Sequence, residues 1–534
     1  MSNRFDVEKI VSENKELQKY LYTRGFLFTN ANVNYELFPF YGKWNVQKIG
    51  NYTLSNDKKI KVFKVKTEKE IIILIGHVYN PFDGLIDENE ILNKYANSND
   101  RISYMNEWTG VFTIIIISEN GVEIFGDCAG MQANYYGFVR GDFYLTSHSQ
   151  LIGDLCELKR SKYVQKITKY RFWQMYGIFL PGDISQFDEI KRLVPNTFVR
   201  VNMQNRQCDI IRFYPLSDLV NNSNENEYNR TIEKIGSLMN KNIELISKKW
   251  SKPAISMTGG MDSKATVACT NGLYDKFKYY SYVTMDGDIP DSKAAKTIAE
   301  KIGVEHKTYV VSRNDNDFEN LSKITKIMEH NLGDLGIVNP NDVRKRIYFM
   351  DTSEFDVEVK SWVSEIGRAN YYKKFGLKKM PKRLSPRQMT SMYKFFSYNR
   401  YTEKLTERIF KEYINKTKFN EIYNYDSSDM YLWEFRYGSW GGLVITSEHR
   451  VSYDITIPYN NRLIMELFLS LPLEKRIKDE PHYDLIKHMN SDIDELGITI
   501  VNYNETKRRM YLEKFYYLIN NILPWWLLWV KKYY

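Results

Sequence analysis

A short apolar strand that runs into a glycine-rich loop and then a helix constrains the fold of this chain more than any other feature. Residues 254–257 (AISM) have the strand pattern, and residues 258–263 (TGGMDS) form the loop. Glycines let a backbone approach an anion without a Cβ in the way, and amides at a helix N-terminus attract phosphate. Thr258 and Ser263 add hydroxyl donors, and the carboxylate of Asp262 suits Mg²⁺. The order of these groups predicts a loop that holds the pyrophosphate of a nucleotide.

Two other interpretations of this loop explain less. A plain Gly-Gly turn with Asp or Ser capping the helix would use similar residues, but it does not require this order of hydroxyl, glycines and acid. A Walker-type loop would need the spacing GxxxxGK[ST], which is absent here.

The hydrophobic pattern divides the chain into two parts. Up to about residue 215 short β-branched runs predict strands, whereas from about residue 227 helices and strands alternate, as in an α/β domain with a parallel sheet. The strands expected in the first part are 71–75, 111–117, 122–125, 143–146 and 197–202. The elements expected next are helix 228–248, strand 254–257, helix 263–270, strand 279–284 and helix 291–302. The polar segment 216–230 is the linker or the start of the next helix, so we predict domains over 1–220 and 225–534, the latter ending in helices.

Composition and charge exclude several classes of protein. Apolar residues make up 43% of the chain and charged residues 26%, which fits a folded globular protein. The net charge of +9 is spread along the chain, so nucleic acid is not an expected partner. The cysteines Cys128, Cys156, Cys208 and Cys269 lie far apart with no CxxC, which excludes a zinc cluster and favours a reducing cytoplasm.

The C-terminus carries an unusual aromatic segment. Residues 523–530 read LPWWLLWV and are followed by Lys531 and Lys532. Tryptophan flanked by lysine suits a membrane interface, and the alternative is a segment docked on the domain core. The segment is too short to span a bilayer, and the N-terminus has no apolar signal region. We expect a cytoplasmic protein, with peripheral contact at the inner membrane surface as the open alternative.

The loop after strand 254–257 resembles the signature SxGGxDS of the N-type ATP pyrophosphatase superfamily, and within it the asparagine synthetase group, which includes β-lactam synthetase and related amide ligases. Thr258 stands at the place of the usual first serine. Further segments resemble the same group: 108–112, 125–136, 190–196, Asp291 with His306, 454–461 and 463–472. The resemblance implies an α/β and α+β fold: an N-terminal Ntn-hydrolase-like αββα sandwich, then an α/β ATP-pyrophosphatase (adenine nucleotide α-hydrolase-like) domain with a helical C-terminal part.

The family's glutaminase nucleophile is missing. That nucleophile is a cysteine at the second position, where this chain has Ser2, and no cysteine precedes Cys128. Cys128 falls in a family turn, where we expect it to be packed rather than reactive. We therefore predict that the first domain does not hydrolyse glutamine.

The resemblance also implies roles for individual residues. Segment 360–368 (KSWVSEIGR) is the best match to the family loop SGEGADE, so Glu365 takes the position of its metal-binding acid, Trp362 a substrate-side position, and Arg368 can reach phosphates or a carboxylate. Asp291 is expected to be a helix cap or a structural acid rather than a catalyst. Lys507 is expected to stabilise developing charge, with a solvated surface lysine as the alternative. The full set is catalytic Lys507, Asp454 and Glu365; a Mg²⁺ site at Asp262 and Glu365; and ATP binding by Ser256, Thr258, Gly259, Gly260, Asp262, Ser263, Val283 and Ser361.

These expectations describe an ATP-dependent carbon–nitrogen ligase. A carboxylate of a small molecule, a sugar acid or a peptide would be adenylated with release of pyrophosphate, and ammonia or an amine would then take the acyl group. The sequence leaves the oligomeric state open, with a homodimer as one option. The alternatives are asparagine synthetase proper acting on aspartate, a non-catalytic nucleotide-binding homologue, and a sulfur-transfer or tRNA-modifying pyrophosphatase; the absence of paired cysteines argues against the last.

Overall fold

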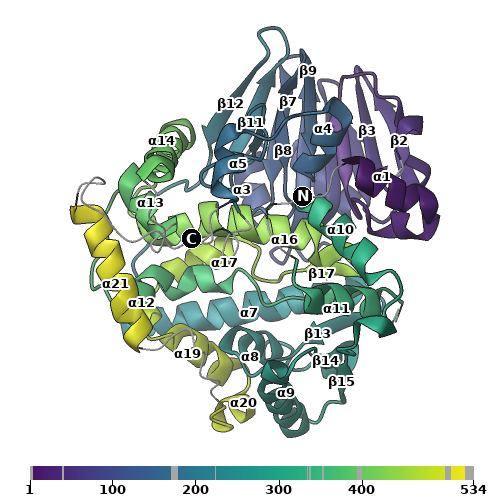
Figure 1. The fold of residues 1–534 in the computed structure, drawn as a ribbon. Helices are drawn as coiled ribbons and strands as arrows, with labels where there is room; N and C mark the ends of the chain where they lie inside the picture. Colours follow the sequence, from purple (N-terminus) through teal and green to yellow (C-terminus); the bar gives the residue numbers. More distant parts are fainter. Residues whose placement is uncertain are drawn as a thin grey trace.

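A computed structural model describes residues 4–38, 41–169, 173, 179–222, 224–333, 335, 338–351, 354–393, 400–498 and 507–523. It is a mixed α/β structure with three sheets, two antiparallel ones in the first part of the chain and a parallel one in the second (Figure 1). The first part therefore has the strand-rich character, and the second the alternating character, that the sequence predicts.

The two antiparallel sheets have six strands each. One has the order β10-β8-β9-β1-β3-β2 and the other β12-β11-β7-β6-β5-β4. The strands are β1 Phe26–Thr29, β2 Trp44–Ile49, β3 Tyr52–Asp57, β4 Val62–Lys66, β5 Glu70–Tyr79, β6 Thr109–Ser118, β7 Gly121–Gly126, β8 Tyr135–Val139, β9 Asp142–Thr146, β10 Ile190–Arg192, β11 Thr197–Asn202 and β12 Gln207–Arg212. All five strands predicted for this part are present. A hairpin at Asn120-Gly121, a pair of residues typical of such turns, joins β6 to β7, with Ser118 paired to Gly121.

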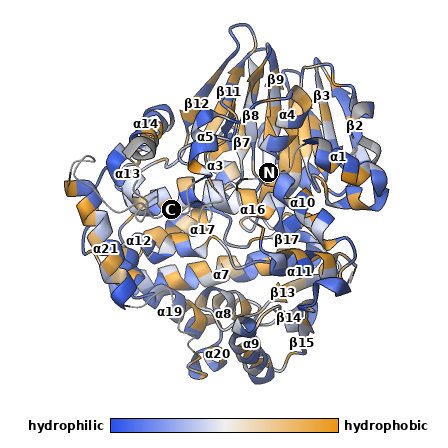
Figure 2. Ribbon diagram, viewed as in Figure 1, coloured by the Kyte–Doolittle hydropathy of each residue, from blue (hydrophilic) through white to orange (hydrophobic). Residues whose placement is uncertain are grey.

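The two sheets pack face to face and are covered by helices. Alternate apolar side chains of both sheets, such as Phe28 and Ile73, share one buried cluster between the layers. The helices α2 (Glu88–Asn97) and α3 (Arg101–Asn106) cover the outer face of the β5–β6 sheet around Trp108. The helices α1 (Arg4–Glu13), α4 (Ser149–Cys156) and α5 (Lys162–Ile167) belong to the core on the other side. Figure 2 shows hydrophobic residues along the strands of the two antiparallel sheets.

A helix precedes the first strand of the sandwich. The helix α1 and a 3-10 turn over Lys15–Tyr20 come before β1, which begins at Phe26. The chain therefore enters this sheet as an internal segment rather than at its N-terminal residue. Ser2 lies outside the described residues.

The third sheet is parallel, with the order β15-β14-β13-β16-β17. Its strands are β13 Pro253–Ser256, β14 Lys278–Val283, β15 His306–Val310, β16 Val357–Val359 and β17 Asp454–Thr456. The helices α7 (Glu225–Lys249), α8 (Met261–Ala268) and α9 (Ile289–Ile302) connect or flank them. Asn224 caps α7 by accepting the Glu227 amide, which explains why the polar segment 216–230 ends in a helix. The predicted strands and helices of this region are confirmed, with ends shifted by up to three residues.

Helices make up most of the remaining described chain. They are α10 Leu321–Asn331, α11 Pro340–Asp351, α12 Asn370–Phe375, α13 Pro386–Tyr393, α14 Arg400–Thr417, α15 Ser427–Met430, α16 Gly442–Ser447, α17 Arg462–Leu469, α18 Leu473–Ile477, α19 Glu480–Met489, α20 Ser491–Glu495 and α21 Lys507–Ile522. Between α15 and α16, Tyr431–Gly441 forms a π-helix, a rare geometry that is frequent at functional sites. Within the described part of the chain, no helix has the length and apolarity to cross a membrane. Residues 524–530 of the predicted interfacial segment lie outside that part.

Buried polar contacts join the sandwich to the second part. Arg212 of β12 forms a two-bond ion pair with Glu434 of the π-helix, with donor–acceptor distances of 2.6 and 2.8 Å. The Asn460 amide bonds Asp127 and the Gly110 carbonyl. Cys128 is buried at this junction, and its carbonyl accepts from the Trp433 indole. Burial raises the pKa of the Cys128 thiol, so this cysteine is packed, as predicted.

Candidate functional site

The candidate site lies at the carboxyl ends of the parallel strands, where open α/β sheets bind their ligands. The loop 258–263 follows β13, and the segment 360–368 follows the neighbouring strand β16. Thr266 of α8 donates to the Ser361 hydroxyl at 2.7 Å, which ties the two segments together. Val283 ends β14 on the other side of β13, so it too lies at this edge.

The loop amides are bonded within the protein. The amide of Thr258 donates to Ser263 Oγ at 2.9 Å, that of Gly259 to Asp291 Oδ1 at 3.0 Å, and that of Gly260 to Thr258 Oγ1 at 3.2 Å. Asp291 thus supports the loop, in line with the structural role predicted for it. Both hydroxyl oxygens accept loop amides in this conformation, and the role of Thr258 and Ser263 as hydroxyl donors to a phosphate stays a prediction.

The first turn of α8 supplies the available amides. Gly260 is its N-cap residue with φ −68° and ψ 151°, and no side chain caps the helix. This backbone is extended rather than left-handed, so Gly260 is not required for a positive φ; a Cβ there would lie 3.2 Å from Thr258 Oγ1. The uncapped N-terminus leaves the partial positive charge of the helix open to an anion.

The carboxylate of Asp262 stands on this first turn and carries two strong hydrogen bonds. Arg368 Nη1 donates to Asp262 Oδ2 at 2.7 Å, and Ser364 Oγ donates to Asp262 Oδ1 at 2.6 Å. Arg368 also holds Asp479 through Nε at 2.8 Å and Nη2 at 3.1 Å. Lys373 donates to the same Asp479 at 2.7 Å. The site therefore contains an alternating network of acids and cations, with Arg368 at its centre.

The segment 360–368 has a strained backbone. Val363 is fully buried and has φ 78°, and Ala369 has φ 47°. A β-branched residue with positive φ is a genuine outlier, and such strain concentrates at ligand sites. The unusual turn brings Ser364 and Arg368, four residues apart, to the same carboxylate of Asp262.

Glu365 lies in the same electrostatic environment as Asp262. Burial, Glu365 and Asp262 together raise the pKa of the Tyr437 hydroxyl well above its ordinary value. Glu365 also acts on Arg436, the residue before Tyr437 on the π-helix. The two acids predicted to hold a metal therefore both act electrostatically on Tyr437 of the π-helix.

The two tryptophans Trp362 and Trp440 form a stacked pair beside these charges. Their ring centroids are 5.0 Å apart at an interplanar angle of 18°, and both rings are half-buried. Lys360 lies 5.3 Å from the Trp362 ring centroid, and Arg436 lies 5.8 Å from that of Trp440. Cations over aromatic faces are attracted by the ring quadrupole. Trp362 follows Ser361, which is bonded to α8, and its substrate-side position stays a prediction.

One histidine of the site is not among the residues predicted from the sequence. His482 of α19 is 1% exposed, stacks on Phe468, and points Nε2 toward Asp262 Oδ1 at 3.8 Å. Neither ring nitrogen has a hydrogen-bond partner among the described residues. Burial lowers the pKa of His482 to about 4, so the ring is neutral at pH 7. No local pattern around 480–489 marks this residue, because its neighbour in space is 220 positions away in the chain.

Two predicted catalytic residues are not brought to the loop. Asp454 begins β17 and pairs in register with the first residue of β16, so it lies at the amino ends of the strands. Burial alone would raise the pKa of Asp454, but Arg450, His77 and Arg24 hold it well below its usual range. Asp454 is therefore a member of a buried charge cluster against the sandwich. Lys507 is exposed at the start of α21, a helix that packs on α12 and α13, and no described side chain of the loop bonds it.

The residues present do not fit a resident Mg²⁺. Magnesium takes oxygen ligands, usually one or two carboxylates together with phosphates and waters. Both oxygens of Asp262 already accept hydrogen bonds, one of them from the guanidinium of Arg368. Within the described residues, no group of three His, Cys, Asp or Glu side chains could hold a metal ion. A cation between Asp262 and Glu365 would have to displace Arg368 first.

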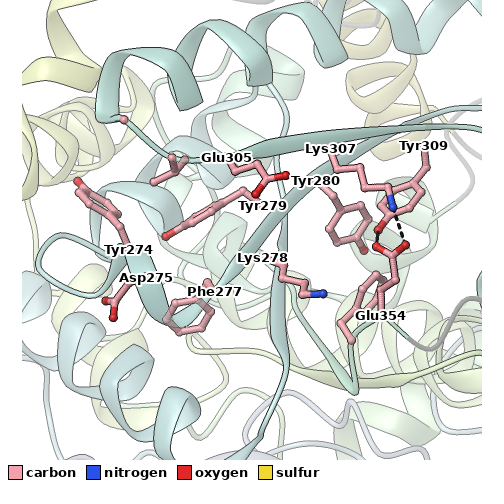
Figure 3. A pocket seen from close by; sticks show the side chains of 13 residues that line it. Tyr274, Asp275, Phe277, Lys278, Tyr279, Tyr280, Glu305, Lys307, Tyr309 and Glu354 are labelled. Carbon is pink, nitrogen blue, oxygen red and sulfur yellow. Dashed lines mark hydrogen bonds and ion pairs between the residues drawn. The ribbon is translucent and has the colours of Figure 1, made fainter.

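A separate cavity of about 510 Å³ lies at the amino ends of β14 and β15. Aromatic and charged side chains line it, and Figure 3 shows Lys307 and Tyr309 converging on the carboxylate of Glu354. None of the predicted site residues lines this cavity. The nucleotide loop and this cavity are therefore at opposite ends of the parallel strands.

Comparison with known proteins gives one family match. Residues 252–342 match the model of the asparagine synthase family, which confirms the predicted resemblance for this segment. No curated protein matches the chain. Among solved structures, the chain is similar to glutamine phosphoribosylpyrophosphate amidotransferase from B. subtilis complexed with ADP and GMP, with 9% identity over 68% of this chain and 74% of that chain and a TM-score of 0.22. It is also similar to a structure described as the allosteric regulatory enzyme of purine biosynthesis, with 8% identity over 65% and 90% of the two chains and a TM-score of 0.24.

Proposed function

We propose that this chain is an ATP-dependent amide-forming ligase of the asparagine synthetase type. It adenylates a carboxylate, releases pyrophosphate, and passes the acyl group to ammonia or an amine. The observation that carries the proposal is the loop 258–263, which lies in the family-matching segment at the carboxyl edge of the parallel sheet, with the uncapped α8 N-terminus beside Arg368 and Asp262. ATP, with Mg²⁺ bound to its phosphates, is the co-substrate.

In this proposal the two parts of the chain have different tasks. Residues 225–534 form the synthetase domain, and residues 1–220 form an Ntn-hydrolase-like sandwich without glutaminase activity. An N-terminal nucleophile uses its own free α-amine as a base, whereas β1 here is preceded by α1 and a 3-10 turn. Gly25 stands directly before β1, and a Cβ at this position would lie 2.7 Å from the Tyr22 carbonyl oxygen. These features support ammonia or an amine, rather than glutamine, as nitrogen donor.

The adenylation step needs positive charge beside the leaving group. A carboxylate oxygen of the substrate attacks the α-phosphorus of ATP, and the bond between that phosphorus and the bridging oxygen of the β-phosphate breaks, leaving pyrophosphate. Arg368 and the first-turn amides of α8 are the groups that can stabilise the charge on pyrophosphate. We therefore give Arg368 the charge-stabilising role that the sequence suggested for Lys507.

The second step forms the amide. The amine nitrogen attacks the acyl carbon of the adenylate, the bond from that carbon to the phosphate oxygen breaks, and AMP leaves. The nitrogen then loses a proton, for which Glu365 is the acid–base candidate at the substrate side of the loop.

The environment of the tryptophan pair supports a ring-shaped carboxylate, such as a sugar acid, as substrate. Aromatic faces pack against the C–H faces of sugars, and an arginine pairs with a carboxylate in two-bond geometry. Arg436 is suited to this pairing because no carboxylate of the described residues forms an ion pair with it, although Glu365 acts on it from farther away. Aspartate, the substrate of asparagine synthetase proper, has no ring for Trp362 and Trp440.

One observation favours a second candidate, a non-catalytic nucleotide-binding homologue. The amides of residues 258–260 are all bonded within the protein, so the loop is not preformed for phosphate. Incubating the purified protein with ATP and a panel of uronic acids, aspartate and peptide acids, with ammonia present, separates the candidates. Carboxylate-dependent formation of AMP and pyrophosphate supports the ligase; ATP binding without turnover for any acid supports the homologue.

A further inference from the structure

We propose that Arg368 is the cation of the nucleotide site and binds the pyrophosphate part of ATP. It takes the position beside Asp262 where the sequence predicts a Mg²⁺ ion held by the protein. This inference rests on the proposed function, because it assumes that ATP binds at loop 258–263. Beyond that function, Arg368 is the group that neutralises the phosphates, and nucleotide binding does not depend on a metal held by Asp262 and Glu365.

The geometry of Arg368 is that of a preorganised anion receptor. Asp479 accepts two hydrogen bonds from the guanidinium, of 2.8 and 3.1 Å, whereas Asp262 accepts a single hydrogen bond of 2.7 Å. A guanidinium has five N–H donors, and these three bonds use three of them. The single bond to Asp262 is the one that a phosphate oxygen can replace or share, while Asp479 keeps the planar group in place.

The anchor itself is fixed by a second cation. Lys373 donates to Asp479 Oδ1 at 2.7 Å, so the negative charge of Asp479 is divided between Lys373 and Arg368. Arg368 therefore keeps part of its positive charge for a further anion. Its side chain is only 15% exposed, and a partly buried guanidinium interacts more strongly with phosphate than one in water.

An unpartnered buried histidine points to the same place. His482 Nε2 lies 3.8 Å from Asp262 Oδ1, and neither of its ring nitrogens has a partner among the described residues. A buried polar group without a hydrogen bond is costly, which indicates a missing ligand atom. A phosphate oxygen bound between Arg368 and the α8 N-terminus would give the neutral imidazole N–H an acceptor.

A metal held by the protein would conflict with this arrangement. Mg²⁺ on Asp262 would approach the guanidinium that already occupies Oδ2 of this carboxylate, and like charges at about 4 Å repel. In the adenylation step the electron pair of the broken P–O bond stays on the bridging oxygen of pyrophosphate. Arg368 stabilises that charge by donating N–H hydrogen bonds, and no proton changes hands.

The test is ATP binding by the full chain, measured by calorimetry in EDTA and again with Mg²⁺. We expect the dissociation constants of the unmodified protein in the two buffers to agree within about threefold. Arg368→Gln should weaken binding about 10- to 100-fold in both buffers, the value of charge-assisted hydrogen bonds to phosphate. Arg368→Lys keeps the positive charge but loses the planar guanidinium. Its dissociation constant for ATP should lie between those of the unmodified chain and Arg368→Gln. Arg408→Gln is the matched control, because Arg408 is exposed and its ion pair among the described residues is with Glu412 of its own helix.

Two further measurements make the result decisive. Asp479→Asn removes the anchor without removing the cation, and it should weaken ATP binding by an intermediate factor, so the inference stays testable if Arg368→Gln fails to fold. Binding that requires Mg²⁺ and is unaffected by Arg368→Gln would overturn the inference while leaving the proposed function standing. Absence of ATP binding in both buffers would overturn the proposed function as well.

Discussion

The indole rings of Trp362 and Trp440 lie 5.0 Å apart and almost parallel, although the two residues come from different structural contexts. Trp362 follows the parallel strand β16, whereas Trp440 belongs to the π-helix Tyr431–Gly441. The extra residue per turn of a π-helix changes which side chains face the sheet edge. The pair thus joins the nucleotide side of the site to the surface where we place the carboxylate substrate.

Replacing one ring of the pair should affect the carboxylate and not the nucleotide. We expect Trp440→Ala to raise KM for the carboxylate about tenfold, the value of an aromatic stacking contact, with an unchanged dissociation constant for ATP. Steady-state kinetics with calorimetry checks this. Tyr423→Ala is the control, since Tyr423 is exposed. A weakened affinity for ATP with unchanged KM for the acid would contradict the assignment.

Nitrogen should come from free ammonia or an amine. The proposed function excludes glutamine as the donor, on the ground that α1 and a 3-10 turn precede β1. We expect ammonium to support amide formation and glutamine to give no glutamate, measured by amino-acid analysis of the same reaction. Ser2→Ala should leave the ammonia-dependent rate unchanged. Release of glutamate that disappears in Ser2→Ala would show a working glutaminase.

Acid should destabilise the fold through His482. Burial lowers its pKa to about 4 in the folded protein, against an ordinary value of 6.5, so folding is favoured by the neutral ring. This contribution is fully present above pH 6.5 and is lost as the pH falls toward 4, by at most about 3 kcal/mol. Urea unfolding between pH 7 and 4 should give a smaller loss of unfolding free energy for His482→Gln than for the unmodified chain. Equal slopes for the two proteins would contradict the prediction.

The ion pair between Arg212 and Glu434 should couple the sandwich to the synthetase part. Both side chains are buried and share two hydrogen bonds. Glu434→Gln should cost about 3–5 kcal/mol of unfolding free energy, because it leaves the Arg212 charge unpaired. Replacing both residues by Met and Leu should recover much of the loss, as denaturant titration would show. A single variant as stable as the unmodified chain would mean that the pair does not hold this junction.

The elements fixed by local pattern were predictable. The strands β5 and β6 come from β-branched runs, the Asn-Gly turn sets the register of β6 with β7, and loop 258–263 with α8 follows from residue order alone. Each of these signals lies within about ten consecutive residues, so no knowledge of the tertiary structure was needed.

The contacts that define the site were not predictable in the same way. Arg368 meets Asp262 across 106 positions, and His482 meets it across 220, so only the folded chain shows them. The π-helix and the positive φ of Val363 have no reliable local signature, because tertiary packing imposes both. The family position suggests catalysis for Asp454, whereas register places this residue at the amino ends of the strands, which the sequence alone does not indicate.

The most direct test of the central claim is pyrophosphate release from ATP by the full-length protein with an activating carboxylate and ammonia, compared between the unmodified chain, Asp262→Ala and Asp275→Ala. Asp262 holds Arg368 and Ser364 at the loop, whereas Asp275 lines the cavity at the other end of the strands. We predict that Asp262→Ala lowers the rate at least about 100-fold, because the loop loses the carboxylate that positions Arg368 and Ser364, and that Asp275→Ala keeps the full rate. Pyrophosphate release that persists unchanged in Asp262→Ala would contradict the claim that loop 258–263 performs the chemistry.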